Sequence, residues 1–344
     1  MPPDHSRQPT RDNVLAARAG ERIPRRFDFL VLDEFSMMAF TSAVEPLRAA
    51  NRMSEARLYQ WRTVGVDRAP VTASNGVTVL PEAALGEAGE PETIPDAIVV
   101  CSGLNAEKHA RNAVFAPLRR AARRGVALGS VCTGSLVLAR AGLLDGRRCT
   151  IHWEDLDSFA ENFPRLDISS RLYEIDGDRF TCSGGTAPLD LMIHFIELDF
   201  GHDLAVRVAE QMLHHFTRKA SEPQRLAIAE RTGVRHPGLL EAIAQMEAQL
   251  EAPAELAAIA ARAGLSLRQL ERLAGAHLGT SPARYYRTLR LNRARHLVTH
   301  TALPLAEVAL ACGFTSAAHF ARTYRECFTV SPSRDRGASS RANA

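Results

Sequence analysis

Short apolar runs alternate with amphipathic segments along the first two thirds of the chain. The apolar runs have the length of strands, and the segments between them carry apolar residues at helical spacing. The predicted elements are strands at 27–32, 60–66, 96–101 and 126–131, helices at 37–51, 106–124, 133–141, 188–200 and 203–219, and a hairpin at 173–182. Continuously apolar strands separated by helices are typical of a parallel sheet covered on both faces. We therefore expect an N-terminal α/β domain.

The last third of the chain has a different pattern, because every periodic segment there has the period of a helix. Helices are predicted at 238–251, 254–263, 267–276, 282–300, 304–311 and 316–327. The polar stretch before them contains Pro223, Gly233 and Pro237, which is typical of a linker. We divide the chain into a flexible tail at 1–25, an α/β domain at 26–220, a linker at 221–237, an all-α domain at 238–336 and a disordered tail at 337–344.

Composition agrees with two folded domains. The chain has 344 residues, of which 46% are hydrophobic and 24% charged, and this excludes a wholly disordered protein. The sequence has no apolar run long enough for a transmembrane helix and no apolar core of a secretory signal. Its six cysteines show neither a C-x-x-C pair nor zinc-ligand spacing. We expect reduced thiols, a cytoplasmic protein, and no metal or other cofactor.

Charge is distributed unevenly along the chain. From Pro253 onward there are 13 Arg, no Lys and 5 acidic residues, a net charge of +8, while the preceding 252 residues carry −5. A basic C-terminal third suggests a nucleic-acid surface. A solvated basic face would give the same count, so charge alone leaves both interpretations open.

The all-α segment contains a loose internal repeat. Leu256-Ala257-x-x-Ala260-x-x-Ala263-Gly264-Leu265-Ser266 is matched by Leu305-Ala306-x-x-Ala309-x-x-Cys312-Gly313-Phe314-Thr315, and each copy is followed by Ser-Pro. The small residue lets two helices cross closely, and the glycine supplies the positive φ of a short turn. Ser266 or Thr315 can cap the helix that follows. Two such copies in a basic, helical segment predict a pair of DNA-binding helix-turn-helix units.

At residues 235–336 the chain resembles the AraC/XylS family of transcription regulators. The second unit carries the resemblance, from Ala311-Cys312-Gly313-Phe314 through His319-Phe320 to Ser331-Pro332. The resemblance implies two recognition helices, joined by a long helix at 282–300, that enter successive major grooves of promoter DNA. One departure is Thr329, where the family usually has glycine, and we expect slight strain or a changed turn there.

The recognition helices supply the candidates for contact with DNA. They are Leu267, Arg268, Gln269 and Arg272 in the first helix, and Ser316, Ala317, His319 and Arg322 in the second. Arg pairs with guanine and Gln with adenine in the major groove. Contact with phosphate alone, or core packing in the case of His319, is the alternative. We expect the arginines of the linking helix, Arg290, Arg293 and Arg295, to be phosphate-contacting or surface groups.

A second constellation surrounds Cys132. The buried strand at 126–131 runs directly into this cysteine and a helix follows it, with the small residues Ser130 and Gly134 on either side. This is the arrangement of a nucleophile elbow. The start of a helix lowers the pKa of a cysteine and favours anions, and nearby amides can form an oxyanion hole. A buried structural cysteine remains the alternative.

Residues 27–220 resemble the PfpI-like branch of the class I glutamine-amidotransferase-like superfamily. The matching segments are Cys132-Thr133-Gly134-Ser135, Gly142-Leu143-Leu144-Asp145-Gly146, Thr150-Ile151-His152-Trp153 and Thr181-Cys182-Ser183-Gly184-Gly185-Thr186-Ala187. The resemblance implies a flavodoxin-like parallel-sheet sandwich. A PfpI-like domain joined to an AraC-type domain is the architecture of the GlxA-like regulators. The segment from Asp33 to Asn51 looks closest to regulators of glycine betaine, carnitine and arginine catabolism.

Comparison with enzymes of that superfamily argues against catalysis. Its proteases carry His directly after the cysteine, where this chain has Thr133. The isonitrile hydratases it resembles place an acid at the position of Ala39 and Gly-Pro at Ser42-Ala43. A nucleophile without its acid or base is poorly activated. We therefore expect no enzyme activity, although His152 remains a possible partner of Cys132.

A ligand pocket is expected at the carboxyl ends of the strands. Its candidate residues are Gly103, Cys132, Thr133, His152, Trp153 and Phe40. Trp153 suits a quaternary ammonium through cation–π attraction, and ordinary core packing is the alternative.

Together these features predict a cytoplasmic, ligand-responsive transcription regulator. The resemblance implies a homodimer that activates catabolic genes, with double-stranded promoter DNA, RNA polymerase and a small nitrogenous effector as partners and no membrane association. The rival hypothesis is a thiol-dependent hydratase or amidase that uses Cys132 and is fused to a DNA-binding module. A redox switch at Cys132 is a third possibility.

Overall fold

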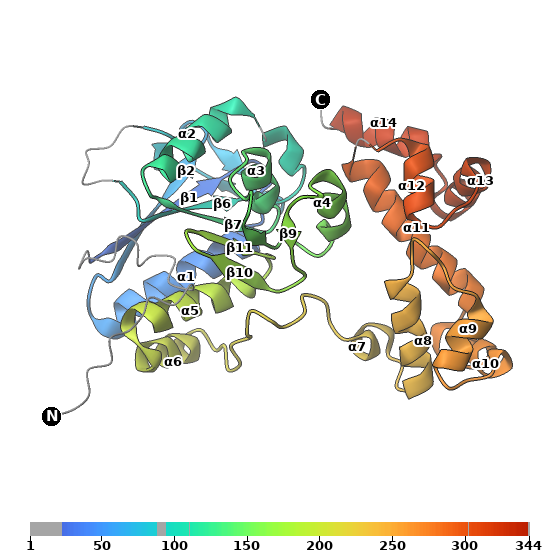
Figure 1. Cartoon of the computed structure of the whole chain (residues 1–344). Coiled ribbons are helices and arrows are strands. Elements are labelled where there is room, and N and C mark those ends of the chain that lie inside the picture. The colour runs from blue at the N-terminus through green and yellow to red at the C-terminus, as the bar shows by residue number, and fades with distance from the viewer. Residues whose placement is uncertain (1–22, 88–93, 110, 302, 343–344) are drawn as a thin grey trace. The chain divides into compact units, whose positions relative to one another are not determined.

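The chain folds into two compact units that meet in sequence between Gln224 and Arg225. The computed structural model describes residues 23–87, 94–109, 111–301 and 303–342, and Figure 1 shows the whole chain. Most of the expected tail at 1–25 lies outside the described residues. The boundary falls inside the expected linker at 221–237.

The first unit is built on a seven-stranded sheet. Its strands are β1 (Arg25–Val31), β2 (Tyr59–Gly65), β5 (Ala83–Ala84), β6 (Ala97–Cys101), β7 (Ala127–Val131), β10 (Tyr173–Asp176) and β11 (Arg179–Cys182). The spatial order is β10-β11-β7-β6-β1-β2-β5, and all neighbours pair in parallel except β10 and β11. The predicted parallel sheet and the predicted hairpin are confirmed.

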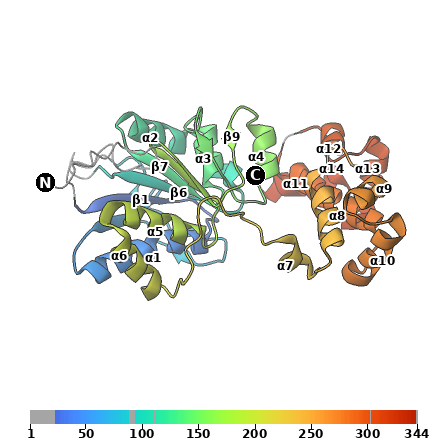
Figure 2. The same ribbon diagram turned by 60° about the horizontal axis from the view of Figure 1, so that its bottom comes forward.

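Helices cover both faces of this sheet, as Figures 1 and 2 show. One core lies under α1 (Met37–Ser54), α5 (Ala187–Phe200) and α6 (His202–Gln211). The other lies under α2 (Asn112–Arg123), α3 (Gly134–Arg140) and α4 (Leu156–Asn162). Strand β1 feeds both cores by alternation, with Phe27, Phe29 and Val31 in the first and Leu30 in the second. Because both faces are covered, the strands read as continuous apolar runs.

Several short elements were not predicted. They are the pair β3 (Val71–Thr72) and β4 (Thr78–Val79), the pair β8 (Arg148–Cys149) and β9 (Asp167–Ile168), and helix α4. The predicted helix at 106–124 is divided into a 3₁₀ turn, η3 (Ala106–His109), and α2. Two-residue strands carry too few positions for an alternation pattern, so tertiary pairing decides them.

The helix expected at 203–219 is shorter than predicted, because α6 ends at Gln211. The chain then turns through Leu213, whose φ is 54°. This turn lets His214 Nε2 come within 2.8 Å, and Arg218 Nη2 within 2.6 Å, of the wholly buried carboxylate of Asp190. A buried carboxylate needs such partners, and this need outweighs helix propensity beyond Gln211.

The second unit is all-helical, as predicted. Its helices are α7 (Ile228–Thr232), α8 (Pro237–Ala248), α9 (Leu256–Arg262), α10 (Leu267–Leu278), α11 (Pro282–His300), α12 (Leu305–Ala311), α13 (Ala317–Phe328) and α14 (Pro332–Ala342). One core gathers α8, α9, α10 and Tyr286, and a second gathers α12, α13 and the later turns of α11. The long helix α11 therefore joins two small cores, each belonging to one helix-turn-helix unit.

The two helix-turn-helix units contain the same turn. Gly264 and Gly313 adopt φ of 69° and 71°, as the glycine spacing predicted. Ser266 caps α10, but the cap of α13 is Ser316 and not Thr315. Ser316 occupies the extended position before the first helical residue, and its hydroxyl accepts a hydrogen bond from His319 N at 3.3 Å.

Both ends of the second unit are more ordered than expected. Within the segment 221–237, α7 forms, and the side chains of Ile228 and Val234 pack on the core formed by α8, α9 and α10. At the other end, α14 continues to Ala342, through most of the tail expected to be disordered at 337–344. Asp335 in its first turn accepts hydrogen bonds from Tyr324 Oη at 2.7 Å and from Arg295 Nε at 3.1 Å. These contacts dock a segment whose small, polar composition shows no apolar pattern.

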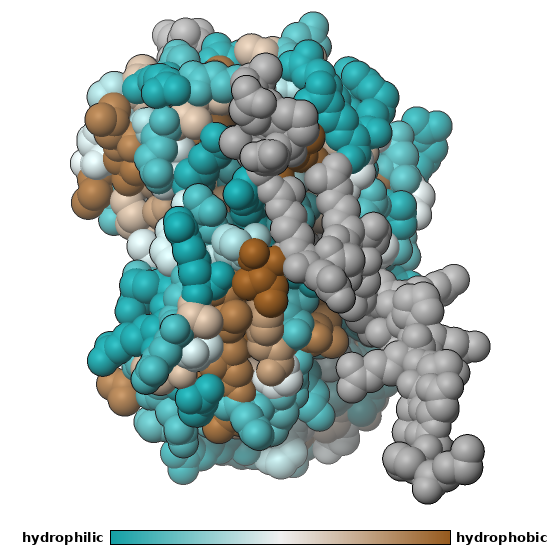
Figure 3. All heavy atoms as spheres, turned by 90° about the vertical axis from the view of Figure 1, so that its left-hand side faces the viewer, coloured by the Kyte–Doolittle hydropathy of each residue, from teal (hydrophilic) through white to brown (hydrophobic). Residues whose placement is uncertain are grey.

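The surface of the chain is mixed in character. Figure 3 shows hydrophilic side chains over much of one face, with separate hydrophobic areas among them. Exposed apolar side chains such as Val77 and Leu80 occur in the described residues, as is ordinary for folded chains.

Thr329 ends α13 with φ 62°, where Gly279 ends α10 with φ 65°. A β-branched residue is strained in this left-handed conformation. We expect Thr329→Gly to raise the free energy of unfolding by about 1 kcal/mol, since relief of strain exceeds the entropy cost of glycine. Urea denaturation measures the change, and Gly279→Thr is the matched control, expected to destabilise. A destabilising Thr329→Gly would show that the threonine conformation is not strained.

Candidate functional site

Cys132 lies in a tight turn between β7 and α3. Its φ is 58°, unusual for a residue other than glycine. The turn is tightly enclosed: a β carbon at Gly134 would clash with the carbonyl oxygen of Val100, and one at Gly184 would lie 2.8 Å from Cys132 Cβ. The predicted elbow is therefore present, and small residues are required around it.

The elbow is joined to the end of the neighbouring strand. Thr133 Oγ1 donates a hydrogen bond to Gly103 O at 2.6 Å. Gly103 in turn pairs with Phe35 in an isolated bridge. Three of the predicted pocket residues, Gly103, Cys132 and Thr133, thus lie together at the carboxyl edge of β6 and β7, where parallel sheets bind ligands.

The environment of Cys132 raises the pKa of its thiol to about 12. Burial is the largest cause, the negative charges of Asp155 and Glu154 add to it, and a hydrogen bond from the Thr133 amide acts in the opposite direction. Our expectation that the start of α3 would lower this pKa is therefore wrong, because desolvation of a thiolate outweighs the helix terminus. At pH 7 the thiol is therefore protonated.

His152 and Trp153 follow Ile151 on the chain. The two rings lie with centroids 5.7 Å apart, and the side chain of Trp153 is 38% exposed. His152 Nδ1 lies 3.6 Å from Glu154 Oε2, and burial lowers the pKa of the imidazole, so that it is neutral at pH 7. The imidazole is thus oriented towards a carboxylate, while Trp153 presents part of its ring to solvent.

Phe40 has a different environment from the other pocket candidates. It is 9% exposed and belongs to the core under α1, where its ring packs edge-on against Phe29 and Phe35 at 5.8 and 5.7 Å. Ala39, where the hydratases carry an acid, is wholly buried. Sequence reasoning missed Glu154 and Asp155, although their position directly after Trp153 was a usable signal.

The first recognition helix, α10, presents most of its predicted residues to solvent. Leu267, Arg268, Gln269 and Arg272 are all exposed. Gln269 Oε1, however, accepts a hydrogen bond from the amide of Ser266 at 2.7 Å and completes a capping box. This bond commits part of its amide to the helix end, which leaves Arg268 and Arg272 with the longest reach.

The second recognition helix, α13, also presents its predicted residues to solvent. Ser316, Ala317, His319 and Arg322 are exposed, and the buried side of α13 is formed by Phe320 and Tyr324. Ser316 serves as the helix cap. The His319 ring lies 6.0 Å from that of Phe314 at the edge of the core.

Arg290 of α11 serves the fold, contrary to our expectation, whereas Arg295 is an exposed surface group, as expected. Arg290 donates from Nε to Cys312 O at 2.8 Å and from Nη2 to Gly313 O at 2.6 Å. Its guanidinium also lies over the Phe314 ring at 4.3 Å. Arg295 lies over Phe328 at 4.8 Å. Arg290 therefore holds the turn of the second helix-turn-helix unit.

Within the residues that the structure describes, His, Cys, Asp and Glu side chains form no group of three or more that could hold a metal ion. The helices of the described residues, which Figure 1 draws as coloured ribbon, include none long and apolar enough to cross a bilayer.

Arg290→Lys keeps the positive charge but loses the planar donor pair. We expect it to lower the free energy of unfolding by about 1–3 kcal/mol, because two buried carbonyl groups lose charged donors. Arg287→Lys, at an exposed position on the same helix, is the control and should change stability by less than about 0.5 kcal/mol. Urea denaturation measures both, and equal effects would contradict a structural role for Arg290.

The raised pKa of Cys132 also predicts an alkylation profile. The rate with iodoacetamide should rise about tenfold per pH unit from pH 7 through pH 10, because the thiolate is the nucleophile and the thiol stays protonated until about pH 12. Peptide mass spectrometry follows the adduct, with the exposed Cys327 as an internal reference. A plateau of the Cys132 rate near pH 7 would contradict this environment.

Each of the two compact units matches a known protein family. Residues 259–338 match a family described as a helix-turn-helix domain, and residues 25–198 match the DJ-1/PfpI family. A crystal structure of an AraC family transcriptional regulator from Pseudomonas putida is 30% identical and covers 55% of this chain and all of that one, with a TM-score of 0.48.

Several relatives match over most of the chain, so that each match spans both units. HTH-type transcriptional regulator CdhR of Pseudomonas aeruginosa is 46% identical over 90% of this chain and 91% of its own. HTH-type transcriptional regulator GbdR of the same species is 43% identical over 92% and 85%, and GlxA of Rhizobium meliloti is 37% identical over 92% and 97%. The chain therefore belongs to the AraC-type helix-turn-helix transcription regulators that carry an N-terminal DJ-1/PfpI domain.

Proposed function

We propose that the DJ-1/PfpI unit is a non-catalytic sensor for a small nitrogenous metabolite that carries an ammonium or guanidinium group. In this proposal the chain works in the cytoplasm as a homodimer, binds promoter DNA through α10 and α13, and activates catabolic genes through contact with RNA polymerase. Glycine betaine, carnitine and arginine represent the effector class.

The acidic and aromatic surroundings of the elbow carry the proposal. Glu154 and Asp155 lie close enough to Cys132 to raise the pKa of its thiol. The partly exposed Trp153 directly precedes them in the chain. Negative charge beside an aromatic face favours an ammonium or guanidinium group, which gains both Coulomb and cation–π attraction.

The rival functions at Cys132 both require a thiolate. Nucleophilic catalysis uses the thiolate, and oxidation to a sulfenic acid begins from it. A pKa near 12 keeps the thiol protonated, the neighbouring His152 is oriented towards Glu154, and alanine stands at the acid position of the hydratases. These three features favour a binding role over a hydratase, an amidase or a redox switch.

The exposed side of the recognition helices supports contact with DNA. Arg268 and Arg272 lie one turn apart on α10, and Arg322 lies in the second turn of α13. In our proposal these three arginines are the principal base or phosphate contacts. Ser316 and Gln269 contribute mainly through the capped helix ends that they hold.

Arg268→Ala, Arg272→Ala and Arg322→Ala should each weaken binding to an operator selected from a random DNA pool. The expected loss is about 5- to 150-fold, equivalent to about 1–3 kcal/mol for one good base contact. Fluorescence anisotropy at fixed salt measures it. Arg123→Ala, which removes an exposed charge from α2, is the control. Losses no larger than that of the control would exclude these arginines from the interface.

Isothermal titration calorimetry with glycine betaine, dimethylglycine, carnitine and arginine tests the sensor. We expect saturable heat with one of these ligands and no continuing thermal power. Trp153→Ala should weaken this binding by roughly threefold to thirtyfold through loss of cation–π attraction, and Trp153→Phe should restore part of it. Sustained power that disappears in Cys132→Ala would instead indicate an enzyme.

A further inference from the structure

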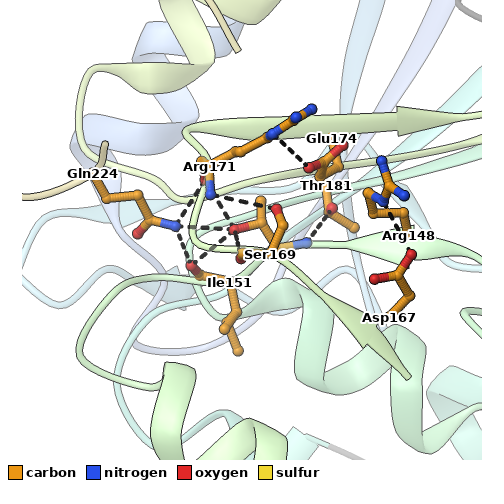
Figure 4. A network of polar contacts seen from close by, with 9 residues as sticks. Arg148, Ile151, Asp167, Ser169, Arg171, Glu174, Thr181 and Gln224 are labelled. Carbon is orange, nitrogen blue, oxygen red and sulfur yellow. Dashed lines mark hydrogen bonds and ion pairs between the residues drawn. The ribbon is translucent and has the colours of Figure 1, made fainter. Parts of the chain in front are cut away.

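A half-buried side chain, that of Gln224, ties the start of the interdomain connection to the segment that carries His152 and Trp153. Gln224 is the last residue of the first unit. Its Nε2 lies 2.9 Å from each of Thr150 Oγ1, Ile151 O and Arg171 O. Figure 4 shows the Gln224 side chain directed towards Ile151 and Arg171. Two N–H groups therefore serve three acceptors, and the amide is held at one point.

Backbone pairing holds the residues before Gln224 in the same place. Pro223 forms an isolated bridge with Arg171, and Leu172 N donates to Ala220 O at 3.1 Å. The connection is thus anchored over 220–224 and enters the second unit directly afterwards. We call the connection that runs from Gln224 into the DNA-binding unit the tether. The position of Gln224 sets where this tether begins.

The anchor is continuous with the cysteine elbow through buried hydroxyls. Ser130, two residues before Cys132, lies with its hydroxyl 2.8 Å from that of Ser135 in the first turn of α3. Ser135 Oγ donates to Thr150 O at 2.6 Å, and Thr150 Oγ1 is one of the acceptors of Gln224. Ser130, Ser135 and Thr150 are fully buried, so no water competes for these bonds.

The hydrogen bonding of the Gln224 side-chain amide is also incomplete. Within the described residues, the buried Oε1 of Gln224 has no hydrogen-bond partner. A buried amide oxygen without a donor costs free energy, and this cost offsets part of what the three Nε2 contacts contribute. Such an anchor holds the tether but can be released by a small change at its acceptors.

We propose that Gln224 couples occupancy of the Cys132 pocket to the tether of the DNA-binding unit. A group bound beside Cys132, His152 and Trp153 shifts the adjoining Thr150 and Ile151, and so changes how firmly Gln224 is held. Release of 221–224 would add about 14 Å of reach to the tether. This inference rests on the proposed sensing role and assigns the route by which that site is read.

Thermodynamic coupling is reciprocal, so the test needs no identified effector. Iodoacetamide serves as the probe, because its adduct on Cys132 adds a group at the proposed ligand site. The full-length protein carries Cys327→Ser, which removes the exposed thiol, and the cysteines other than the partly buried Cys132 are buried. Trypsin reports on the tether, since Lys219 and Arg225 flank the anchor.

Gln224→Ala should raise the rate of cleavage after Lys219 and Arg225 by about fivefold or more, the effect of losing at least one net hydrogen bond. It should also change the alkylation rate of Cys132 by severalfold. In the parent, the Cys132 adduct should change tryptic cleavage at the same two bonds. Gln211→Ala, at the end of α6, is the matched control and should leave both rates unchanged.

Thr150→Val provides a second variant if Gln224→Ala does not fold, because it keeps the side-chain shape but removes one acceptor of Gln224, together with the hydrogen bonds that the hydroxyl donates to Ser169 O and Arg171 O. Faster cleavage in Gln224→Ala, with an unchanged Cys132 rate and no effect of the adduct, would make Gln224 a simple clamp and overturn the coupling. Unchanged cleavage would overturn the anchor itself. Neither result depends on operator binding or on the calorimetric panel, so failure of the proposed function is distinguished from failure of this inference.

Discussion

Close approach of backbone segments at the carboxyl edge of the sheet constrains the rest of the first unit. Side chains larger than hydrogen are excluded at Gly103, Gly134 and Gly184, because a β carbon at each would meet the backbone of Glu34, the carbonyl of Val100 or the atoms of Cys132. These contacts bring the ends of β6 and β7 and the segment before α5 into one small region. Cys132 is forced to φ 58° there. A left-handed cysteine is strained, and strain of this kind persists only where the surrounding structure holds it.

That confinement also decides the chemistry of the cysteine. A thiol enclosed by three backbone segments loses the water that would stabilise its thiolate, and the nearby carboxylates of Glu154 and Asp155 oppose ionisation further. The same carboxylates favour a positively charged neighbour. In this chain the turn therefore holds a neutral thiol close to two carboxylates.

The DNA-binding unit is organised by a different constraint, since each helix-turn-helix unit is too small to hold a large core. Helix α11 contributes Tyr286 to the first core and Leu291 and Leu297 to the second, so it stabilises both. Arg290, between these residues, binds the carbonyls of Cys312 and Gly313 and holds the second turn. A residue expected to contact phosphate or to lie on the surface thus holds the turn of the second helix-turn-helix unit against α11.

The sequence by itself determined the local features of this protein. Apolar runs located β1, β6 and β7, the glycines at 264 and 313 located both turns, and the small residues around Cys132 located the elbow. These are properties of neighbouring residues, and steric limits on the backbone make them readable without the fold. Tertiary structure alone decided the end of α6 at Gln211, the docking of α14, the roles of Arg290 and Gln224, and the raised pKa of Cys132. Each of these depends on a partner or on burial supplied from a distant part of the chain, for which the local pattern has no counterpart.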